Sequence, residues 1–484
     1  MNSAIRHTWV VSVGLFLSLF AALSIIQVAL TDQLGDDHRN SRQLIADLGA
    51  PRGPITVDGN AIAESVPAEN SQYDYQRVYH DPHLYSGITG FFSVVQEPTG
   101  MESAMNDYLT GQSDSQFFDR ISALFTGETL MGAQVELTID GELQQLAHDL
   151  IPDDQRGTIV VQDVNTGEVK AMVSKPTFDA NDLAVHSGEQ FEANLSELTE
   201  ERGVSPYYIP ALNRPIFPGS TFKLITTLAM LESGDYDPDT ELENPQELEL
   251  PQTDRTLPNF FDGGCSQRSE AEFSWIFAQS CNTPFGEAAL ELGQDPLVDA
   301  AERFGWNEGL RIPLYVNPSH FPDEEISLPS LTYSAIGQED VTATPMQMNM
   351  VAAAIANGGQ MMQPQLVDSV RGSDLQILDS PDPEVLHDVM DSSTAETLTE
   401  LMVNTVEEGT GHRADSENFQ VAAKTGTAER GTGDGTVNSW ITGFAPADDP
   451  QYAVTVVYEG IDMSTGNELT GSQMLTMLEA VMEE

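Results

Sequence analysis

The hydrophobic pattern opens with one long apolar run near the N-terminus. Residues 9–30 form a stretch of 22 residues without a charge, which is long enough to cross a bilayer as a helix. Arg6 precedes the run, and Asp32 and Asp36 follow it. This asymmetry predicts that residues 1–8 lie in the cytoplasm and that the rest of the chain lies outside. The length of the run favours an uncleaved anchor over a signal peptide or a buried soluble helix.

The next segment, residues 31–131, is polar and is interrupted by short apolar runs. Gly90–Val95 has the composition of a strand, and glycine and proline recur throughout the segment. No group of residues here suggests catalysis. The pattern predicts a small non-catalytic domain of mixed structure, of the pedestal or dimerisation type.

A shift in composition near Gly132 begins a second domain, predicted over residues 132–484. Strand patterns occur at both ends of this segment, and helical patterns dominate between them. This order predicts an α+β domain in which distant parts of the chain complete one antiparallel sheet. The strands are expected at residues 135–140, 157–164, 169–173, 419–427, 438–444 and 452–458, and the flanking helices at 141–150 and 472–483.

The first candidate for chemistry is the segment Phe217–Lys223. It places Ser220 at the start of an apolar helical stripe that Gly234 ends, with Lys223 on the same helix face. A serine nucleophile needs a nearby base, and a helix N-terminus offers free N–H groups for an oxyanion. The alternative is an ordinary capped amphipathic helix.

The net charge of the chain limits which kinds of partner it can bind. The chain has 76 acidic and 20 basic residues, a formal net charge of −56. Such a field repels nucleic acid. Because the acidic residues are spread along the whole chain, we favour a solvated acidic surface adapted to high salt over a site for a basic partner.

Lysine and cysteine are both rare. The four lysines are Lys170, Lys175, Lys223 and Lys424. Cys265 and Cys281 are the two cysteines; they are either a disulfide in an extracellular domain or two buried thiols. The histidines and cysteines lack metal-site spacing, so no metal is expected.

Two further short segments resemble parts of an active site. Ser280-Cys281-Asn282 places a hydroxyl and a carboxamide two residues apart, on a loop expected between helices. Lys424–Thr427 ends a predicted strand, and Gly426 removes a side chain where another backbone could approach. A strand edge of this kind can bind an extended peptide.

In this order, Ser-x-x-Lys, Ser-x-Asn and Lys-Thr-Gly are the signature set of penicillin-binding proteins and serine β-lactamases. The chain resembles the class B penicillin-binding proteins, most closely the penicillin-binding protein A group of actinobacteria. The resemblance covers nearly the whole chain, including the anchor. It also rests on Arg52–Thr56, Thr166–Met172, Gly337–Gln338, Val341–Pro345 and Trp440–Pro446.

The resemblance implies roles for the motif residues. Ser220 is the expected nucleophile, and Lys223 is the expected base, which requires a lowered lysine pKa. Ser280 is expected to pass a proton to the leaving amine. Lys424 is the fourth expected catalytic residue, because its charge helps to lower the pKa of Lys223, and it also binds the substrate carboxylate. The other expected substrate contacts are Asn282, Thr425, Gly426 and Thr427, with the N–H groups of Ser220 and Thr427 as the oxyanion hole.

The implied reaction is acyl transfer by a membrane-anchored peptidoglycan D,D-transpeptidase. Stem peptides and β-lactams are the expected ligands, division or elongation proteins are possible partners, and no cofactor is expected. A secreted β-lactamase would lack the anchor, and a bifunctional glycosyltransferase would need a longer N-terminal segment. A D,D-carboxypeptidase and a catalytically silent scaffold of the division machinery stay open, whereas the absence of Gly-x-Ser-x-Gly disfavours a Ser-His-Asp hydrolase.

Overall fold

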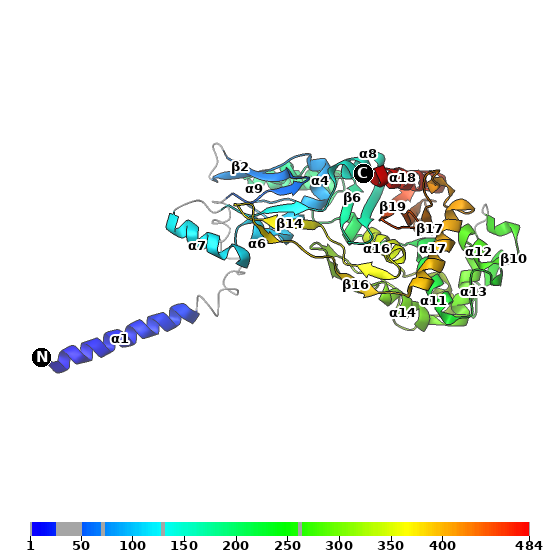
Figure 1. Ribbon diagram of the computed structural model, residues 1–484, viewed down its shortest axis with the longest axis horizontal. Coiled ribbons are helices and arrows are strands. Elements are labelled where there is room, and N and C mark those ends of the chain that lie inside the picture. Colours follow the sequence, from blue (N-terminus) through cyan, green and yellow to red (C-terminus); the bar gives the residue numbers. More distant parts are fainter. Residues whose placement is uncertain (1, 26–50, 69–72, 127–130, 260–263, 484) are drawn as a thin grey trace.

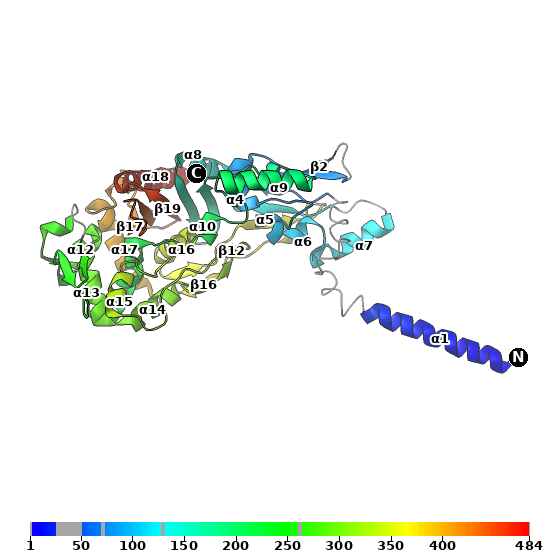
Figure 2. The same cartoon turned by 180° about the vertical axis from the view of Figure 1, so that it is seen from behind.

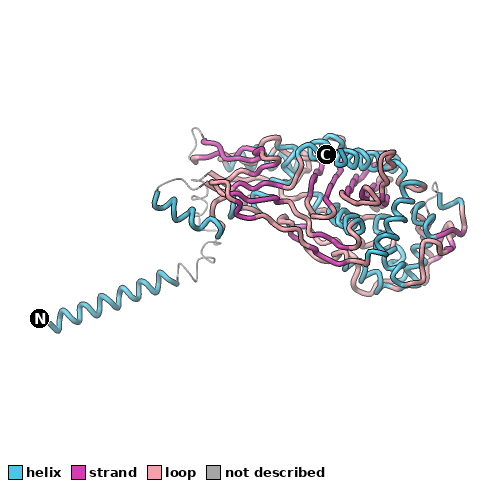
Figure 3. Tube along the Cα trace, in the orientation of Figure 1, coloured by secondary structure: helices cyan, strands magenta, loops and turns pink. Residues whose placement is uncertain are grey.

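The computed structural model describes residues 2–25, 51–68, 73–126, 131–259 and 264–483. The molecule is elongated, with the N-terminal helix and a first sheet toward one end (Figure 1, Figure 2). A second sheet, covered by helices, forms the other end. Figure 3 shows the strands of this second sheet between layers of helix.

Residues 9–24 of the predicted apolar run form the C-terminal part of a long helix. Helix α1 is Asn2–Ser24, and within it Ile5–Ser24 has a mean hydropathy of 1.6 and no buried residues. The helix therefore begins earlier than the apolar run, and residues 26–30 of the prediction lie outside the described residues. An apolar helix that packs against no protein is consistent with a membrane anchor.

The first sheet has six strands in the order β15-β14-β4-β1-β2-β3. Strand β1 pairs in parallel with β4 and antiparallel with β2. Three of the six strands come from the chain after residue 132, so the N-terminal segment does not build this sheet alone. The strands are β1 (Ile55–Val57), β2 (Asn60–Pro67), β3 (Tyr75–Tyr79), β4 (Gln134–Leu137), β14 (Val367–Arg371) and β15 (Ile377–Asp379).

The prediction of a strand at Gly90–Val95 is wrong. Phe91 and Val94 are buried, but the stretch has no regular structure. Its backbone groups are satisfied locally, because Phe91 exchanges hydrogen bonds with Thr99 and the Phe92 N–H donates to the Tyr79 hydroxyl. The helices of the N-terminal segment are α4 (Pro82–Thr89), α5 (Gly100–Ala104), α6 (Asn106–Leu109) and α7 (Phe117–Thr126).

A buried charge cluster joins the parts of this domain. Glu102 accepts from Arg52 Nε at 3.0 Å and from Arg77 Nε at 2.6 Å, with all three side chains at most 2% exposed. Burial alone would raise the pKa of Glu102, but the two guanidinium charges outweigh burial and hold the pKa below its usual value.

The second sheet is antiparallel, as predicted, in the order β17-β18-β19-β5-β6. Its first two strands in the chain precede the helical region and its last three follow it. Helices α8 (Gly141–Leu150) and α18 (Met463–Glu483) cover one face, and α16 (Pro345–Ala356) covers the other. The strands are β5 (Arg156–Asp163), β6 (Val169–Lys175), β17 (Ala422–Glu429), β18 (Val437–Ala445) and β19 (Tyr452–Ile461).

Helix α18 is two turns longer than the predicted helix at 472–483. Its first half contains glycine and threonine, which have low helix propensity. Tertiary packing explains the difference. A Cβ at Gly466 would lie 2.5 Å from the Ser439 Cβ, and one at Gly471 would lie 2.6 Å from the Arg413 Cβ, so the helix sits too close to its neighbours for larger residues.

The helical region lies at the end of the molecule farthest from α1 (Figure 1). Small paired strands connect its helices. The helices of the second domain that have not yet been named are α9 (Gly188–Ser196), α10 (Pro210–Asn213), α11 (Lys223–Ser233), α12 (Phe273–Gln279), α13 (Thr283–Leu292), α14 (Gln294–Arg303), α15 (Leu328–Ser334) and α17 (Ser392–Glu407). The paired strands are β7 (Glu241–Glu243) with β10 (Glu270–Glu272), β8 (Glu247–Glu249) with β9 (Thr256–Pro258), β11 (Leu310–Arg311) with β12 (Tyr315–Val316), and β13 (Gln360–Met362) with β16 (Val385–Asp388).

The buried cluster gives a stability prediction. Glu102→Gln leaves two buried guanidinium groups without their anion, so the N-terminal domain should lose about 3–5 kcal/mol of unfolding free energy. Urea unfolding followed by circular dichroism measures the loss. Glu232→Gln is the matched control, because it removes an exposed partner of Arg303 and should cost at most about 1 kcal/mol. Equal losses in the two variants would contradict this account.

Candidate active site

Ser220 lies on a tight helical turn that leads into α11. Residues Gly219–Phe222 form a 3-10 helix, and α11 begins at Lys223 and ends at Gly234, which adopts a left-handed φ of 78°. Ser220 is 5% exposed and Lys223 is fully buried. The predicted helix start and stop are confirmed.

This turn packs directly against strand β17, and glycine makes the approach possible. A Cβ at Gly426 would lie 2.7 Å from the Pro218 carbonyl oxygen, and one at Gly219 would lie 2.5 Å from the Thr427 carbonyl oxygen. Gly219 also has a φ of +54°, which favours glycine. The Trp440 indole N–H donates to the Phe217 carbonyl at 3.0 Å and holds the segment from β18.

Ser280-Cys281-Asn282 forms the link between α12 and α13, as predicted. Ser280 ends α12 in the left-handed conformation, with φ 58°. A disulfide joins Cys281 to Cys265, with 5.5 Å between the Cα atoms. The covalent link ties the middle of this motif to the 3-10 turn Gly264–Gln267.

The Lys223 side chain forms its hydrogen bonds with this link instead of with Ser220. Its Nζ donates to the carbonyl oxygens of Ser280 at 2.8 Å and Cys281 at 2.9 Å, and to Asn282 Oδ1 at 2.8 Å. Within the described part of the chain, no hydrogen bond joins the Ser220 hydroxyl to Lys223. The shared helix face predicted from the i, i+3 spacing therefore brings the two residues near each other without pairing them.

Lys424 approaches the same link from β17. Its Nζ donates to Ser280 Oγ at 2.8 Å, and Lys223 Nζ lies 3.5 Å from that oxygen. The Ser280 hydroxyl thus lies between two buried amines.

Both amines have lowered pKa values. Burial lowers the pKa of Lys424 to about 7. Burial, and next the charge of Lys424, lower the pKa of Lys223 well below its usual value. The acceptors around Lys223 Nζ are carbonyl, amide and hydroxyl oxygens. Among the described residues, neither lysine has a carboxylate partner, whereas Lys170 and Lys175 each form an ion pair.

The Asn282 carboxamide is already engaged within the protein. Its Oδ1 accepts from Lys223, and its Nδ2 donates to the Pro258 carbonyl at 3.1 Å. Asn282 is 8% exposed and does not line the cavity. The predicted contact between Asn282 and substrate therefore stays a prediction.

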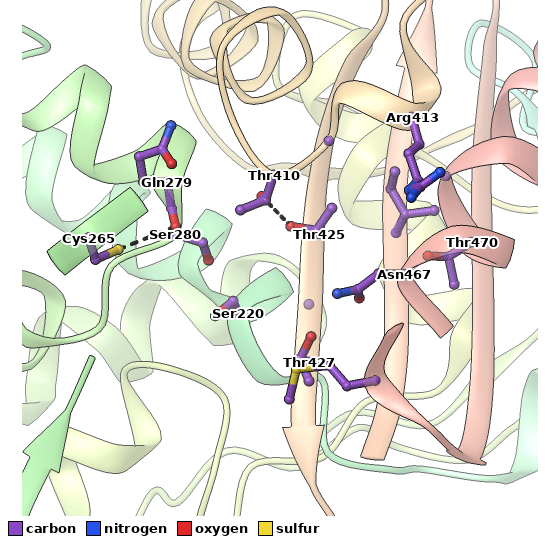
Figure 4. Close-up of a pocket in the computed structure, with 15 residues that line it drawn as sticks. Ser220, Cys265, Gln279, Ser280, Thr410, Arg413, Thr425, Thr427, Asn467 and Thr470 are labelled. Atoms are coloured by element: carbon purple, nitrogen blue, oxygen red, sulfur yellow. Dashed lines mark hydrogen bonds between the residues drawn. The ribbon is translucent and has the colours of Figure 1, made fainter. Parts of the chain in front are cut away.

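A cavity of about 430 Å³ opens where these segments meet. Figure 4 shows Ser220 and Ser280 on one side of β17, and Arg413, Asn467 and Thr470 on the other. Thr425 bonds to the Thr410 hydroxyl at the rim. The lining includes Ser220, Ser280, Thr425, Gly426 and Thr427 from the predicted site. In the part of the chain that the structure describes, no cluster of side chains is suited to a metal ion.

The half of the cavity beyond β17 was not predicted from the sequence. Arg413 is exposed there, lines the cavity, and has no ion-pair or hydrogen-bond partner among the described residues. Asn467 and Thr470, on α18, line the same half of the cavity. Arg413, a basic residue eleven positions before Lys424 in so acidic a chain, was the available signal, but the start of α18 that carries Asn467 and Thr470 was not predicted.

Known proteins resemble this chain in sequence and in fold. The family described as penicillin binding protein transpeptidase domain matches residues 157–479, and the penicillin binding protein A dimerisation domain matches residues 52–135. Peptidoglycan D,D-transpeptidase PbpA of Mycolicibacterium smegmatis is 37% identical over 466 residues, which cover 95% of this chain and 94% of that protein.

Solved structures agree with the sequence matches. The crystal structure of PBPA from Mycobacterium tuberculosis has a TM-score of 0.84 at 32% identity, covering 90% of this chain and 99% of that one. The imipenem acyl-enzyme complex of penicillin-binding protein A from the same organism also has a TM-score of 0.84 at 32% identity, covering 90% of this chain and all of that one. With both domains matched in order and three motif segments meeting at one cavity, the chain belongs to the penicillin-binding protein transpeptidase family.

Proposed function

We propose that this chain cross-links peptidoglycan as a serine D,D-transpeptidase and that Ser220 carries the acyl group. One observation supports the assignment of residues above the others. Ser280 Oγ lies between two buried lysines that have no carboxylate partner in the described part of the chain, and it lines the same cavity as the serine of the first motif. Buried amines with lowered pKa values are suited to moving protons during acyl transfer.

The reaction begins with attack of Ser220 Oγ on the carbonyl carbon between the two D-alanines of a stem peptide. Lys223 accepts the serine proton, which requires its neutral form. The backbone N–H groups of Ser220 and Thr427 hold the oxyanion. Ser280 then passes a proton to the leaving D-alanine amine and takes up the proton held by Lys223. An amine from a second stem peptide attacks the acyl-enzyme, and the proton that this amine loses restores the Ser220 hydroxyl. A β-lactam acylates the same serine.

The donor peptide lies along the outer edge of β17, which pairs with a strand on one side only among the described residues. Lys424, Thr425 and Thr427 bind its terminal carboxylate, and Gly426 lets the peptide and the Ser220 turn approach the strand. Asn282 orients the link that holds Lys223. Arg413 adds a positive charge to a cavity that must attract an anion in a strongly acidic protein.

The location follows from α1 and its flanks. We infer one membrane crossing, with residues 1–8 in the cytoplasm and the catalytic domain outside, at the plasma membrane. The disulfide between Cys265 and Cys281 fits an oxidising compartment. Partners from the division or elongation machinery would contact the chain on this outer side.

The acidic surface is proposed as an adaptation to high salt. Twenty basic residues cannot pair 76 acidic ones, so most carboxylates repel one another at low ionic strength. Screening shortens the Debye length from about 30 Å at 0.01 M to about 3 Å at 1 M salt. We expect the thermal midpoint of unfolding to rise by roughly 5 °C or more between these concentrations. A midpoint that rises equally in a non-ionic osmolyte, or does not rise, would contradict this adaptation.

Loss of the nucleophile is the direct test of the assigned site. Ser220→Ala should reduce acylation by a fluorescent penicillin by roughly 10³-fold or more, because no other group forms the ester. Ser233→Ala, at the end of α11, is the matched control and should label normally. A long-lived label in the parent protein is expected of a transpeptidase, and rapid loss with drug turnover of a β-lactamase. Growth supported by Ser220→Ala would favour the scaffold role.

The two lysines give a pH prediction. The acylation rate should rise with pH as Lys223 loses its proton. Because the charge of Lys424 helps to lower the pKa of Lys223, Lys424→Met should raise that pKa and move the rising limb to higher pH by on the order of one unit. Lys170→Met, which removes a lysine paired with Glu168, should leave the limb in place. A limb that stays or moves to lower pH in Lys424→Met would contradict this role of Lys424.

A further inference from the structure

Helix α7 exposes a row of phenylalanines on the N-terminal domain. Phe118 is 79% exposed and Phe125 is 88% exposed, and Phe117 and Ile121 beside them are 48% and 37% exposed. Outside α1, no other phenylalanine among the described residues is exposed to this degree. A soluble surface rarely carries such a group without a binding role.

The four side chains share one face of the helix. Their spacing of three or four and seven or eight residues places them in one stripe along two turns. Arg120 secures the helix from another side, because its Nη1 donates to the carbonyl oxygens of Gly111 at 3.0 Å and Ser113 at 2.6 Å. These bonds fix which face turns outward, so the apolar stripe is held away from the domain.

The position of α7 identifies what covers the stripe. Helices α7 and α1 lie at the same end of the molecule in both views (Figure 1, Figure 2). The 26 residues between Ser24 and Pro51 can span at most about 90 Å when fully extended. The anchor alone therefore sets no fixed height for the body above the membrane.

We propose that α7 inserts its phenylalanine face into the headgroup region of the outer leaflet and forms a second membrane contact beside α1. The proposal rests on the proposed membrane topology. Aromatic side chains favour this depth of a bilayer. The body carries a large negative charge, so anionic headgroups repel it and the contact is apolar rather than electrostatic.

A second copy of the chain fits the stripe less well. A helix of ten residues is about 15 Å long, so one face of it covers on the order of 200 Å². A stable protein interface buries about 800 Å² on each partner. A bilayer needs no complementary patch, so the narrow stripe is sufficient there.

Two attachment points would also restrict tilting of the body. The cavity lies in the domain at the opposite end of the molecule from α1 and α7 (Figure 1). Docking of α7 would hold this cavity at a defined height, facing the polymer rather than the lipid.

The test uses the full-length protein in vesicles of phosphatidylcholine and phosphatidylglycerol that contain lipids brominated on the acyl chains. Trp9 lies in α1, so quenching of the emission that the parent protein has and Trp9→Phe lacks reports whether the anchor is inserted. Phe118→Trp in a Trp9→Phe background reports on α7. Leu328→Trp in the same background is the control, because Leu328 is 38% exposed on α15, far from α1 (Figure 2).

We expect brominated lipid to reduce the emission added by Phe118→Trp at least twofold, in low and in high salt, and to leave that added by Leu328→Trp unchanged. Quenching of Trp9 without quenching at position 118 would overturn the proposal and leave the anchor intact. If neither is quenched, both the anchor and the α7 contact fail.

A second variant separates lipid from a second copy. Phe118→Ser with Phe125→Ser should free the body from the lipid surface, leave labelling of the catalytic domain by fluorescent penicillin unchanged, and leave the circular dichroism spectrum unchanged, which shows that both domains still fold. If this variant instead abolishes self-association of the protein in vesicles, and position 118 is not quenched, the stripe binds a second copy and the lipid proposal is wrong.

Discussion

The arrangement of the catalytic domain depends on one constraint, which is that two buried lysines must lie beside one serine hydroxyl. Lys223 begins α11, Ser280 ends α12, and Lys424 lies on β17. Burying two amines without a carboxylate is costly unless their donors are satisfied. Here carbonyl, amide and hydroxyl oxygens supply the acceptors. The helical region and the sheet must therefore meet at this point, and the disulfide at Cys281 fixes the link that provides most of the acceptors.

Close backbone packing explains why the same motifs are structural as well as chemical. The Ser220 turn touches β17 only because Gly219 and Gly426 lack side chains. Gly337 continues this contact from the far side, since its carbonyl accepts from the Gly219 N–H at 3.0 Å. A larger residue at either position of the turn–strand contact would separate the nucleophile from the strand edge. The geometry of the site thus depends on van der Waals contact between main chains as well as on the hydrogen bonds that hold Ser280 between the two lysines.

The sheet and the catalytic motifs were predictable because each leaves a local signal. Segments of strand length, separated by the glycine-rich residues 431–435 and by residues 446–450, mark β17, β18 and β19, and Gly234 marks the end of α11. The failures have tertiary causes. The first turns of α18 are stabilised by close packing at Gly466 and Gly471, which helix propensity does not predict. Phe91 is buried, but it lies in a loop closed by its hydrogen bond with Thr99. The hydrogen bonds of Lys223 could not be predicted either, because the spacing of residues along a helix does not show which carbonyl groups from other parts of the sequence lie close to it.

Basic residues of this acidic chain differ in whether a carboxylate lies beside them. Arg52 and Arg77 neutralise Glu102 inside the N-terminal domain, and Lys170 and Lys175 pair with carboxylates near the surface. Lys223, Lys424 and Arg413 differ, since none of them has a carboxylate partner among the described residues and all three lie in or beside one cavity. Burial lowers the pKa of both lysines, whereas the exposed guanidinium of Arg413 carries a permanent charge. The cavity therefore combines two kinds of cation, because the buried amines can exchange protons and the exposed guanidinium can attract an anion.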